Sequence, residues 1–222
     1  MTIASAKDLA RCLDYALLKP DATRADVEHF CQEARKHLLR AVCVPGSHVE
    51  LACSQLEETG VQVSALVGFP LGVADMDAKR YETEIAVDQG AHEIDFVINI
   101  GRLKDGDTRY VLREMRDVTE AADERPVKAI LETHLLNRDD KLLGCRLAVD
   151  SGVQFVSTST DFNAPAASMD DVKLLREAVG LQFGIKVSGG IRDSKAALAL
   201  IAAGANRIGT SAAAEVLRGF KD

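Results

Sequence analysis

Short apolar runs alternate with longer amphipathic stretches along nearly the whole chain, and this alternation restricts the fold more than any other feature. In the amphipathic stretches apolar residues recur at spacings of three and four, as at Val111, Met115 and Val118. We therefore expect helices at residues 24–38, 48–58, 78–88, 108–123, 140–150, 169–179, 194–202 and 212–220. Strands are expected at residues 41–44, 61–67, 93–98, 127–132, 153–157, 184–187 and 206–208. Residues 12–18 fit either a further strand or the end of a first helix.

Strands that alternate with helices in this way pair in parallel through right-handed crossover connections. Seven or eight such units in 222 residues fit one compact (β/α)8 barrel, so we predict a single domain over residues 1–222 with a short N-terminal helix. The main alternative is an open doubly wound sheet. That fold normally carries a GxGxxG loop after its first strand, whereas residues 42–47 read Val-Cys-Val-Pro-Gly-Ser. The prediction is an α/β protein of the (β/α)8 TIM-barrel class.

Composition and charge exclude several functional classes. The net charge is −7 and no cluster of lysine and arginine with interleaved aromatic residues appears, so nucleic acid is not an expected partner. The 5 cysteines show no CxxC spacing, which argues against a disulfide framework or a zinc site, and we expect neither a metal nor a cofactor. No apolar run is long enough to cross a membrane, and residues 1–8 lack the apolar core of a signal peptide. We expect a cytoplasmic protein that does not bind membranes.

A (β/α)8 barrel carries its chemistry at the carboxyl ends of its strands. Side chains alternate between the two faces of a strand, and Asp95, Lys128 and Lys186 each lie between two apolar neighbours. Because a buried charge is costly unless it is paired, we expect these three side chains to meet inside the barrel. They form either a reactive centre or an ion pair that only fixes strand register. In a reactive centre, two adjacent ammonium groups should lower each other's pKa, which would make one lysine a base or a nucleophile.

The expected strand at residues 153–157 delivers Ser157 into a loop of small hydroxyl residues, 158–160. A serine nucleophile needs a base, and neither His92, which precedes its strand, nor His134, which lies on a loop, is placed to supply one. We therefore assign Ser157 to the catalytic group as a hydrogen-bond donor to the substrate. Further candidates for substrate binding are Cys43, Asn99, Ser159, Asp161, Gly189, Gly190 and Ser211. A small core thiol is the alternative interpretation of Cys43.

Five segments in collinear order resemble the deoxyribose-phosphate aldolase family, and the resemblance runs from about residue 10 to residue 215. They are residues 13–20 (Leu-Asp-Tyr-Ala-Leu-Leu-Lys-Pro), 67–72 (Val-Gly-Phe-Pro-Leu-Gly), 93–101 (Glu-Ile-Asp-Phe-Val-Ile-Asn-Ile-Gly), 127–133 (Val-Lys-Ala-Ile-Leu-Glu-Thr) and 186–192 (Lys-Val-Ser-Gly-Gly-Ile-Arg). The resemblance implies a class I aldolase on a (β/α)8 barrel, in which a lysine forms a Schiff base with a small carbonyl substrate. It also implies that Asp95 relays protons, that Lys186 assists, and that Lys128 is an additional strand lysine.

The chain departs from the family pattern at the site itself. Ser157 stands where the resemblance places the Schiff-base lysine, and a serine cannot form an imine. Asp161 replaces the glycine of a Thr-Ser-Thr-Gly loop that approaches a phosphate in the family, and its negative charge opposes an anion. Ala16 and Ala212 replace a threonine and a serine. The departures cluster at the site, which predicts a change of chemistry on a retained scaffold.

Three functions remain open. In the first, Asp95, Lys128 and Lys186 act as acids, bases and oxyanion stabilisers in an aldol or retro-aldol reaction, an isomerisation, a dehydration or a cyclisation. The second is a class I aldolase of the deoxyribose-5-phosphate type in which Lys186 or Lys128 supplies the amine. The third is a catalytically silent homologue that binds a ligand or a partner protein. We expect the first, acting on a small-molecule carbonyl substrate with little or no phosphate, and the resemblance implies a homodimer.

Overall fold

Eight parallel strands close into a barrel in chain order in the computed structural model, which describes residues 3–162 and 165–220. The strands are β1 (Leu13–Ala16), β2 (Ala41–Pro45), β3 (Gln62–Val67), β4 (Glu93–Val97), β5 (Val127–Ile130), β6 (Phe155–Ser157), β7 (Gly184–Ser188) and β8 (Arg207–Thr210). Strand β1 pairs with both β2 and β8, so the sheet has no free edge. The predicted (β/α)8 barrel is confirmed, although residues 1–2, 163–164 and 221–222 of the predicted domain lie outside the described residues.

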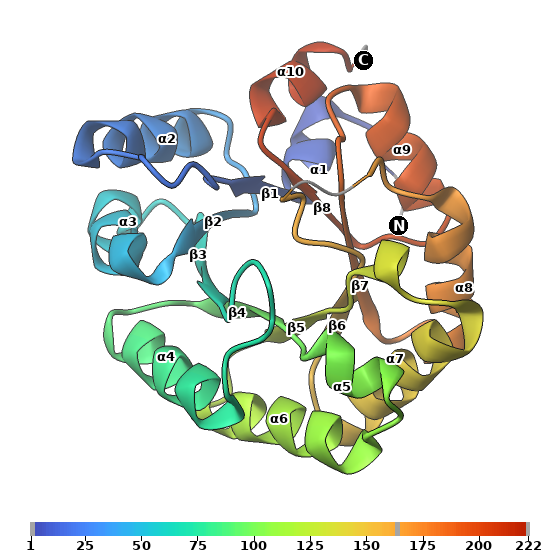
Figure 1. The fold of residues 1–222 in the computed structure, drawn as a ribbon. Coiled ribbons are helices and arrows are strands. Elements are labelled where there is room, and N and C mark those ends of the chain that lie inside the picture. Colours follow the sequence, from blue (N-terminus) through green and yellow to red (C-terminus); the bar gives the residue numbers. More distant parts are fainter. Residues whose placement is uncertain (1–2, 163–164, 221–222) are drawn as a thin grey trace.

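Helices surround the barrel on its outer side (Figure 1). They are α1 (Ala6–Ala10), α2 (Arg24–Lys36), α3 (Val49–Leu56), α4 (Met76–Asp88), α5 (Ile100–Lys104), α6 (Thr108–Ala121), α7 (Arg138–Ser151), α8 (Met169–Val179), α9 (Ser194–Ala202) and α10 (Ala213–Arg218), with 3₁₀ turns η1 (Gly46–His48) and η2 (Thr133–Leu135). Residues 12–18 contribute strand β1, which decides between the two predicted alternatives. Helix α5 was not predicted, because its five residues are too few to show a period. No helix in the described part of the chain is long and apolar enough to cross a membrane.

The helix boundaries follow from local side-chain hydrogen bonds. The Thr23 side chain accepts a hydrogen bond from the Asp26 amide and the Asp26 carboxylate accepts one from the Thr23 amide, so the first turn of α2 begins with a capping box. Asn137 and Asp140 form the same arrangement at the start of α7. Helix α7 ends at Gly152, whose φ of 89° lies in the left-handed region that favours glycine. These caps fix where α2 and α7 begin and where α7 ends.

The strands have two different faces. Outward side chains such as Ile94, Phe96 and Ala129 pack into the apolar layer beneath the helices. The alternating inward side chains include Asp95 and Lys128, which are buried but polar. Adjacent parallel strands place paired residues on the same face, and the register pairs Asp95 with Lys128. The helix-packed layer stabilises the barrel, whereas the inner face holds the charged groups.

Candidate active site

Asp95, Lys128 and Lys186 meet inside the barrel, as the strand alternation predicts. Lys128 Nζ lies 2.5 Å from Asp95 Oδ1, and Lys186 forms an ion pair with the other oxygen of the same carboxylate. Ser64 of β3 donates a hydrogen bond of 2.8 Å to Asp95 Oδ1 and accepts one of 3.2 Å from Lys128. The Asp95 carboxylate is therefore held by two ammonium groups and one hydroxyl group.

Three further charged side chains extend this group into a network of six. Glu93 Oε2 lies 2.6 Å from Lys128 Nζ and 2.9 Å from an Arg207 guanidinium nitrogen. Asp14 lies 2.6 Å from Arg207 and 3.2 Å from Lys186 Nζ. The six residues, which we call the charged cluster, are Asp14, Glu93, Asp95, Lys128, Lys186 and Arg207. Its three carboxylates balance its three cations.

The sequence reasoning missed three members of this cluster. Glu93 precedes Asp95 by two residues on β4, so the same alternation that identified Asp95 also indicates Glu93. Asp14 and Arg207 lie on β1 and β8, which are short strands whose inward faces are hard to assign from the sequence. Closure of the barrel between β1 and β8 is what brings these two residues together.

The cluster keeps both lysines protonated. Burial lowers the pKa of Lys186, but the carboxylates of Asp95 and Asp14 outweigh burial and raise that pKa well above its usual value. The pKa of Lys128 is also raised, because Asp95 and Glu93 outweigh its burial. Lys186 does lower the pKa of Lys128, as predicted, but the net pKa shift of both lysines is upward, so the predicted low lysine pKa is wrong. The prediction included the repulsion between the two ammonium groups. It did not include the attraction of the Asp14 and Glu93 carboxylates, which is larger.

The carboxylates respond in the opposite direction. Burial by itself raises the pKa of Asp95, but Lys128 and Lys186 outweigh it and hold that pKa well below its usual range. The same balance, with Lys128 and Arg207 as the cations, lowers the pKa of Glu93 to about 2. Both groups are anions near neutral pH. Asp95 in this state is a weak base, and it acts mainly to hold the two ammonium groups in place.

Among the three predicted charged residues, Lys186 is the one that keeps exposed surface. It is 5% exposed, compared with 1% for Asp95 and 0% for Lys128. The ammonium of Lys128 points at Glu93 and Asp95 and is enclosed by them. Lys186 is therefore the least completely buried of the three.

Ser157 ends β6 directly beside Lys186. The two residues are register partners between β6 and β7, so their side chains share the inner face of the barrel. Ser157 is fully buried, and its hydroxyl oxygen has no hydrogen-bond partner among the residues that the structure describes. A buried hydroxyl group without a partner costs free energy, so this oxygen is available for a ligand group.

Cys43 lies on the other side of the Lys186 ammonium. Its sulfur accepts a hydrogen bond of 3.3 Å from Lys186 Nζ, and burial raises the pKa of the thiol to about 12, so it stays neutral. Donor atoms of Asp14, Cys43 and Asp95 lie within 4.8 Å of one another, a spacing that could hold a metal ion. Lys186 contacts all three groups and supplies the positive charge at this position.

Two of the predicted binding residues make structural hydrogen bonds. Asn99 is the N-cap of α5, and its side chain accepts a hydrogen bond from the Arg102 amide at 3.1 Å. Ser159 donates a 2.8 Å hydrogen bond to the carbonyl of Ser188, which ties the loop after β6 to the end of β7. Their assignment to substrate binding stays a prediction, and these contacts give both side chains a role in shaping the loops.

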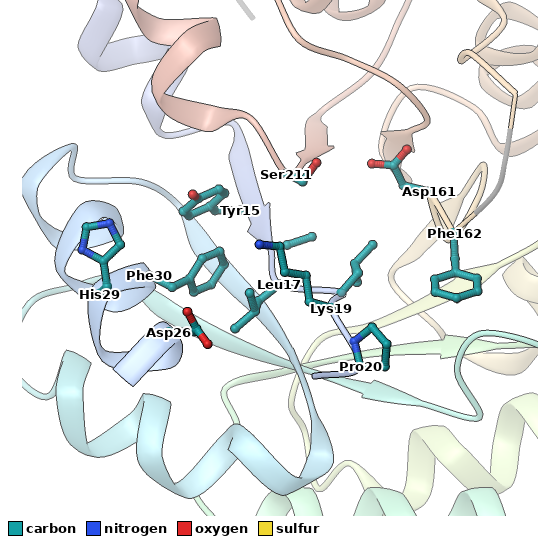
Figure 2. A pocket seen from close by; sticks show the side chains of 12 residues that line it. Tyr15, Leu17, Lys19, Pro20, Asp26, His29, Phe30, Asp161, Phe162 and Ser211 are labelled. Carbon is teal, nitrogen blue, oxygen red and sulfur yellow. The ribbon is translucent and has the colours of Figure 1, made fainter. Parts of the chain in front are cut away.

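A pocket of about 550 Å³ opens beside the end of β1. It is lined by residues 15–20, by Asp26, His29 and Phe30, and by Asp161, Phe162 and Ser211. Tyr15 and Phe30 stack with ring centroids 4.0 Å apart on one side, and Asp161 and Ser211 lie on another side with the Asp161 carboxylate directed toward Ser211 (Figure 2). The charged cluster does not line this pocket. The pocket and the charged cluster therefore share no residue.

The loop residues Asp161, Gly189 and Gly190 come together across 29 positions of sequence. The amide of Gly190 donates a hydrogen bond of 2.8 Å to Asp161 Oδ1. Both glycines have positive φ, 125° at Gly189 and 64° at Gly190. The sequence predicted that Asp161 opposes an anion here, and the structure adds that its carboxylate binds the glycine turn.

The closed barrel and its inner cluster of lysines and carboxylates define the class of (β/α)8-barrel lyases of the aldolase type, and comparisons with known proteins agree. The sequence model of the DeoC/LacD family aldolases matches residues 10–219. The chain belongs to this family.

Several similar proteins are named deoxyribose-phosphate aldolase. Deoxyribose-phosphate aldolase 1 of Bacillus licheniformis is 48% identical over 96% of each chain. Deoxyribose-phosphate aldolase of Bdellovibrio bacteriovorus is 44% identical over 95% of this chain and 96% of its own. The structure of deoxyribose phosphate aldolase from Aeropyrum pernix, described as a unique tetramer, superimposes with a TM-score of 0.92 at 32% identity, covering 99% of this chain and 94% of that chain. The predicted family resemblance is confirmed.

Proposed function

We propose that the protein is an aldolase-type lyase that acts on a small carbonyl substrate without forming a Schiff base. The observation that carries the proposal is the Lys186 ammonium, which is held protonated by Asp95 and Asp14 beside a serine at the end of β6. A protonated lysine cannot attack a carbonyl group, but it can stabilise an oxyanion. Ordinary deoxyribose-phosphate aldolase chemistry through an imine is replaced in this proposal by electrostatic stabilisation.

Lys186 would act on the carbonyl oxygen of the substrate. In a retro-aldol cleavage the β-hydroxyl group loses its proton to water and becomes a carbonyl group as the carbon–carbon bond breaks. The electron pair of that bond moves to the other carbonyl group, which becomes an enolate, and water then protonates the enolate carbon. A hydrogen bond from the Lys186 ammonium stabilises the enolate oxygen. Isomerisation and dehydration of hydroxycarbonyl compounds pass through the same type of enolate, so one geometry serves each of these reactions.

Ser157 would donate a second hydrogen bond to the substrate, at the end that carries the reacting carbonyl group. Its hydroxyl group is buried on the same face as Lys186 and has no partner among the described residues. A serine also has a smaller side chain than the lysine that the family resemblance places there. Because Ser157 is fully buried, small displacements of side chains at the strand ends must open the path to it.

The raised lysine pKa values count against the class I alternative. An imine requires a neutral amine, and the pKa of Lys186 lies well above its usual value because the Asp95 and Asp14 carboxylates around it outweigh its burial. Lys128 is enclosed by Glu93 and Asp95 and has no exposed surface. The proposal also includes a cytoplasmic location and a homodimer, both of which stay predictions.

The experiment that tests this function is a turnover assay on Ser157→Ala. We expect kcat/KM for unphosphorylated hydroxyaldehydes to fall about 2- to 12-fold, which corresponds to one neutral hydrogen bond of about 0.5–1.5 kcal/mol. The free energy of unfolding should stay the same or rise, because the hydroxyl group has no partner in the fold. The measurements are aldehyde release followed by NMR and chemical denaturation.

Ser151→Ala is the matched control. Its hydroxyl group is also buried, but it donates a hydrogen bond of 2.8 Å to the Ala148 carbonyl on α7, far from the charged cluster. This variant should lose about 1 kcal/mol of stability and keep its kcat/KM. A wild-type protein that turns over none of the aldehydes would favour the silent homologue, and an unchanged kcat/KM in Ser157→Ala would remove Ser157 from the site.

A further inference from the structure

We infer that the Asp161 carboxylate takes the place of an external anion at the glycine turn after β7. It thereby selects substrates that carry an uncharged hydroxyl group, rather than a phosphate, at the end away from Lys186. The inference rests on the proposed function for the identity of the reacting end, but it concerns the opposite end of the ligand. The residues that carry it are Asp161, Gly190, Ser211 and Lys19.

The carboxylate of Asp161 occupies the amide hydrogen of Gly190. Asp161 lies on the loop after β6, and its Oδ1 accepts the Gly190 amide hydrogen at 2.8 Å. An amide N–H group makes one good hydrogen bond, so the carboxylate takes the donor that an external anion would need. A phosphate placed at this turn would also meet the negative charge of Asp161 at close range.

The backbone of Asp161 supports a specific role for its side chain. Its φ is 61°, in the left-handed region that glycine adopts without cost and that other residues adopt only with strain. Glycine at this position would relax the backbone and free the Gly190 amide. The chain instead keeps a carboxylate there, and that carboxylate satisfies the turn.

The remaining polar groups of the pocket suit a hydroxyl group. Ser211 and Asp161 both line the pocket, and a ligand hydroxyl group that lies between them can donate to the Asp161 carboxylate and accept from Ser211 (Figure 2). Lys19 is the lysine among the residues that line the pocket. Asp26 lies on the same wall, and the positive charge of Lys19 partly offsets the negative charge of its carboxylate. The two negative charges of Asp26 and Asp161 thus exceed the one positive charge of Lys19. The rest of the wall includes the stacked Tyr15 and Phe30 rings, which suit a carbon chain.

The test is binding of inorganic phosphate, measured by calorimetry and by the shifts of backbone amide NMR signals in the full-length protein. Wild type is expected to show no saturable binding in the millimolar range. Asp161→Gly should bind phosphate at least about tenfold more tightly, with the Gly190 amide signal moving. The phosphate affinity of Asp161→Asn should lie between those of wild type and Asp161→Gly. This variant removes the negative charge, while its side-chain amide oxygen can still accept the Gly190 hydrogen bond.

Glu124→Gly is the matched control. Glu124 is exposed, has a φ of 65° and does not line the pocket, so this variant makes the same backbone and charge change elsewhere. Tight phosphate binding by wild type, no gain in Asp161→Gly, or an equal gain in Glu124→Gly would each overturn the inference. Phosphate binding requires no turnover. A failure of the proposed chemistry would therefore appear in the aldehyde assay and leave this result unaffected.

Discussion

Replacing Lys128 with methionine is expected to lower the free energy of unfolding by about 3–5 kcal/mol. Methionine has a similar volume, so the loss comes from charge rather than from a cavity. The ammonium group of Lys128 contacts Asp95 and Glu93, and all three side chains are almost completely buried. Without it the charged cluster retains three carboxylates and two cations, and one negative charge remains buried without compensation. Urea denaturation at neutral pH measures the change.

The control for this variant is Lys36→Met. Lys36 forms an ion pair with Glu33 at 3.2 Å on the surface of α2, where the lysine side chain is 66% exposed. The same chemical change there should cost less than about 1 kcal/mol, because solvent screens the pair. If Lys128→Met were as stable as Lys36→Met, the charged cluster would not be the balanced buried network described above.

Replacing Lys186 with methionine is expected to lower kcat by about 10²- to 10³-fold, the usual effect of removing one oxyanion-stabilising donor. The loss should appear in kcat more than in KM, because the enolate charge develops only in the transition state. This variant also leaves a buried carboxylate uncompensated, so the assay must be run where circular dichroism shows that the protein is folded. The measurement is steady-state turnover of the hydroxyaldehydes that the wild-type protein accepts.

Lys186→Arg tests whether the positive charge of the side chain is sufficient for activity or whether a lysine amine is required. Arginine keeps the positive charge and donor groups, so it should recover part of the activity if Lys186 acts electrostatically. Arginine cannot form an imine under these conditions, and recovery would therefore count against covalent catalysis. A Lys186→Met variant that keeps kcat within a few-fold of wild type would contradict the role given to Lys186.

The fold was largely predictable because its signals are local. Apolar runs and amphipathic stretches alternate along the chain, and hydrogen bonds of the Thr23 and Asn137 side chains fix the starts of α2 and α7 locally. Strand β1 remained ambiguous because its four residues carry too short a pattern, and it is defined only by pairing with β2 and β8. Helix α5 was missed for the same reason.

The candidate site was predictable only in part. Charged residues between apolar neighbours identified Asp95, Lys128 and Lys186, and the structure brings them together. The protonation state was predicted wrongly, because it depends on the summed effect of partners from β1 and β4 that a local pattern does not count. The hydrogen bond from Gly190 to Asp161 was also beyond prediction, since it joins two loops whose conformations depend on the packing of β6 against β7.

Borohydride reduction in the presence of an aldehyde tests the central claim most directly. The wild-type protein is incubated with acetaldehyde, reduced, and analysed by intact mass and peptide mass spectrometry, with Ser157→Lys run in parallel. Ser157→Lys should give a trapped adduct on the new lysine, because it restores an amine at the position to which the family resemblance assigns the Schiff-base lysine, on the inner face beside Lys186. The account predicts no adduct on Lys186 or Lys128 of the wild-type protein under conditions in which it turns over its substrate, beyond the slow alkylation that exposed lysines such as Lys36 also show. A stoichiometric adduct on Lys186 or Lys128 would contradict it.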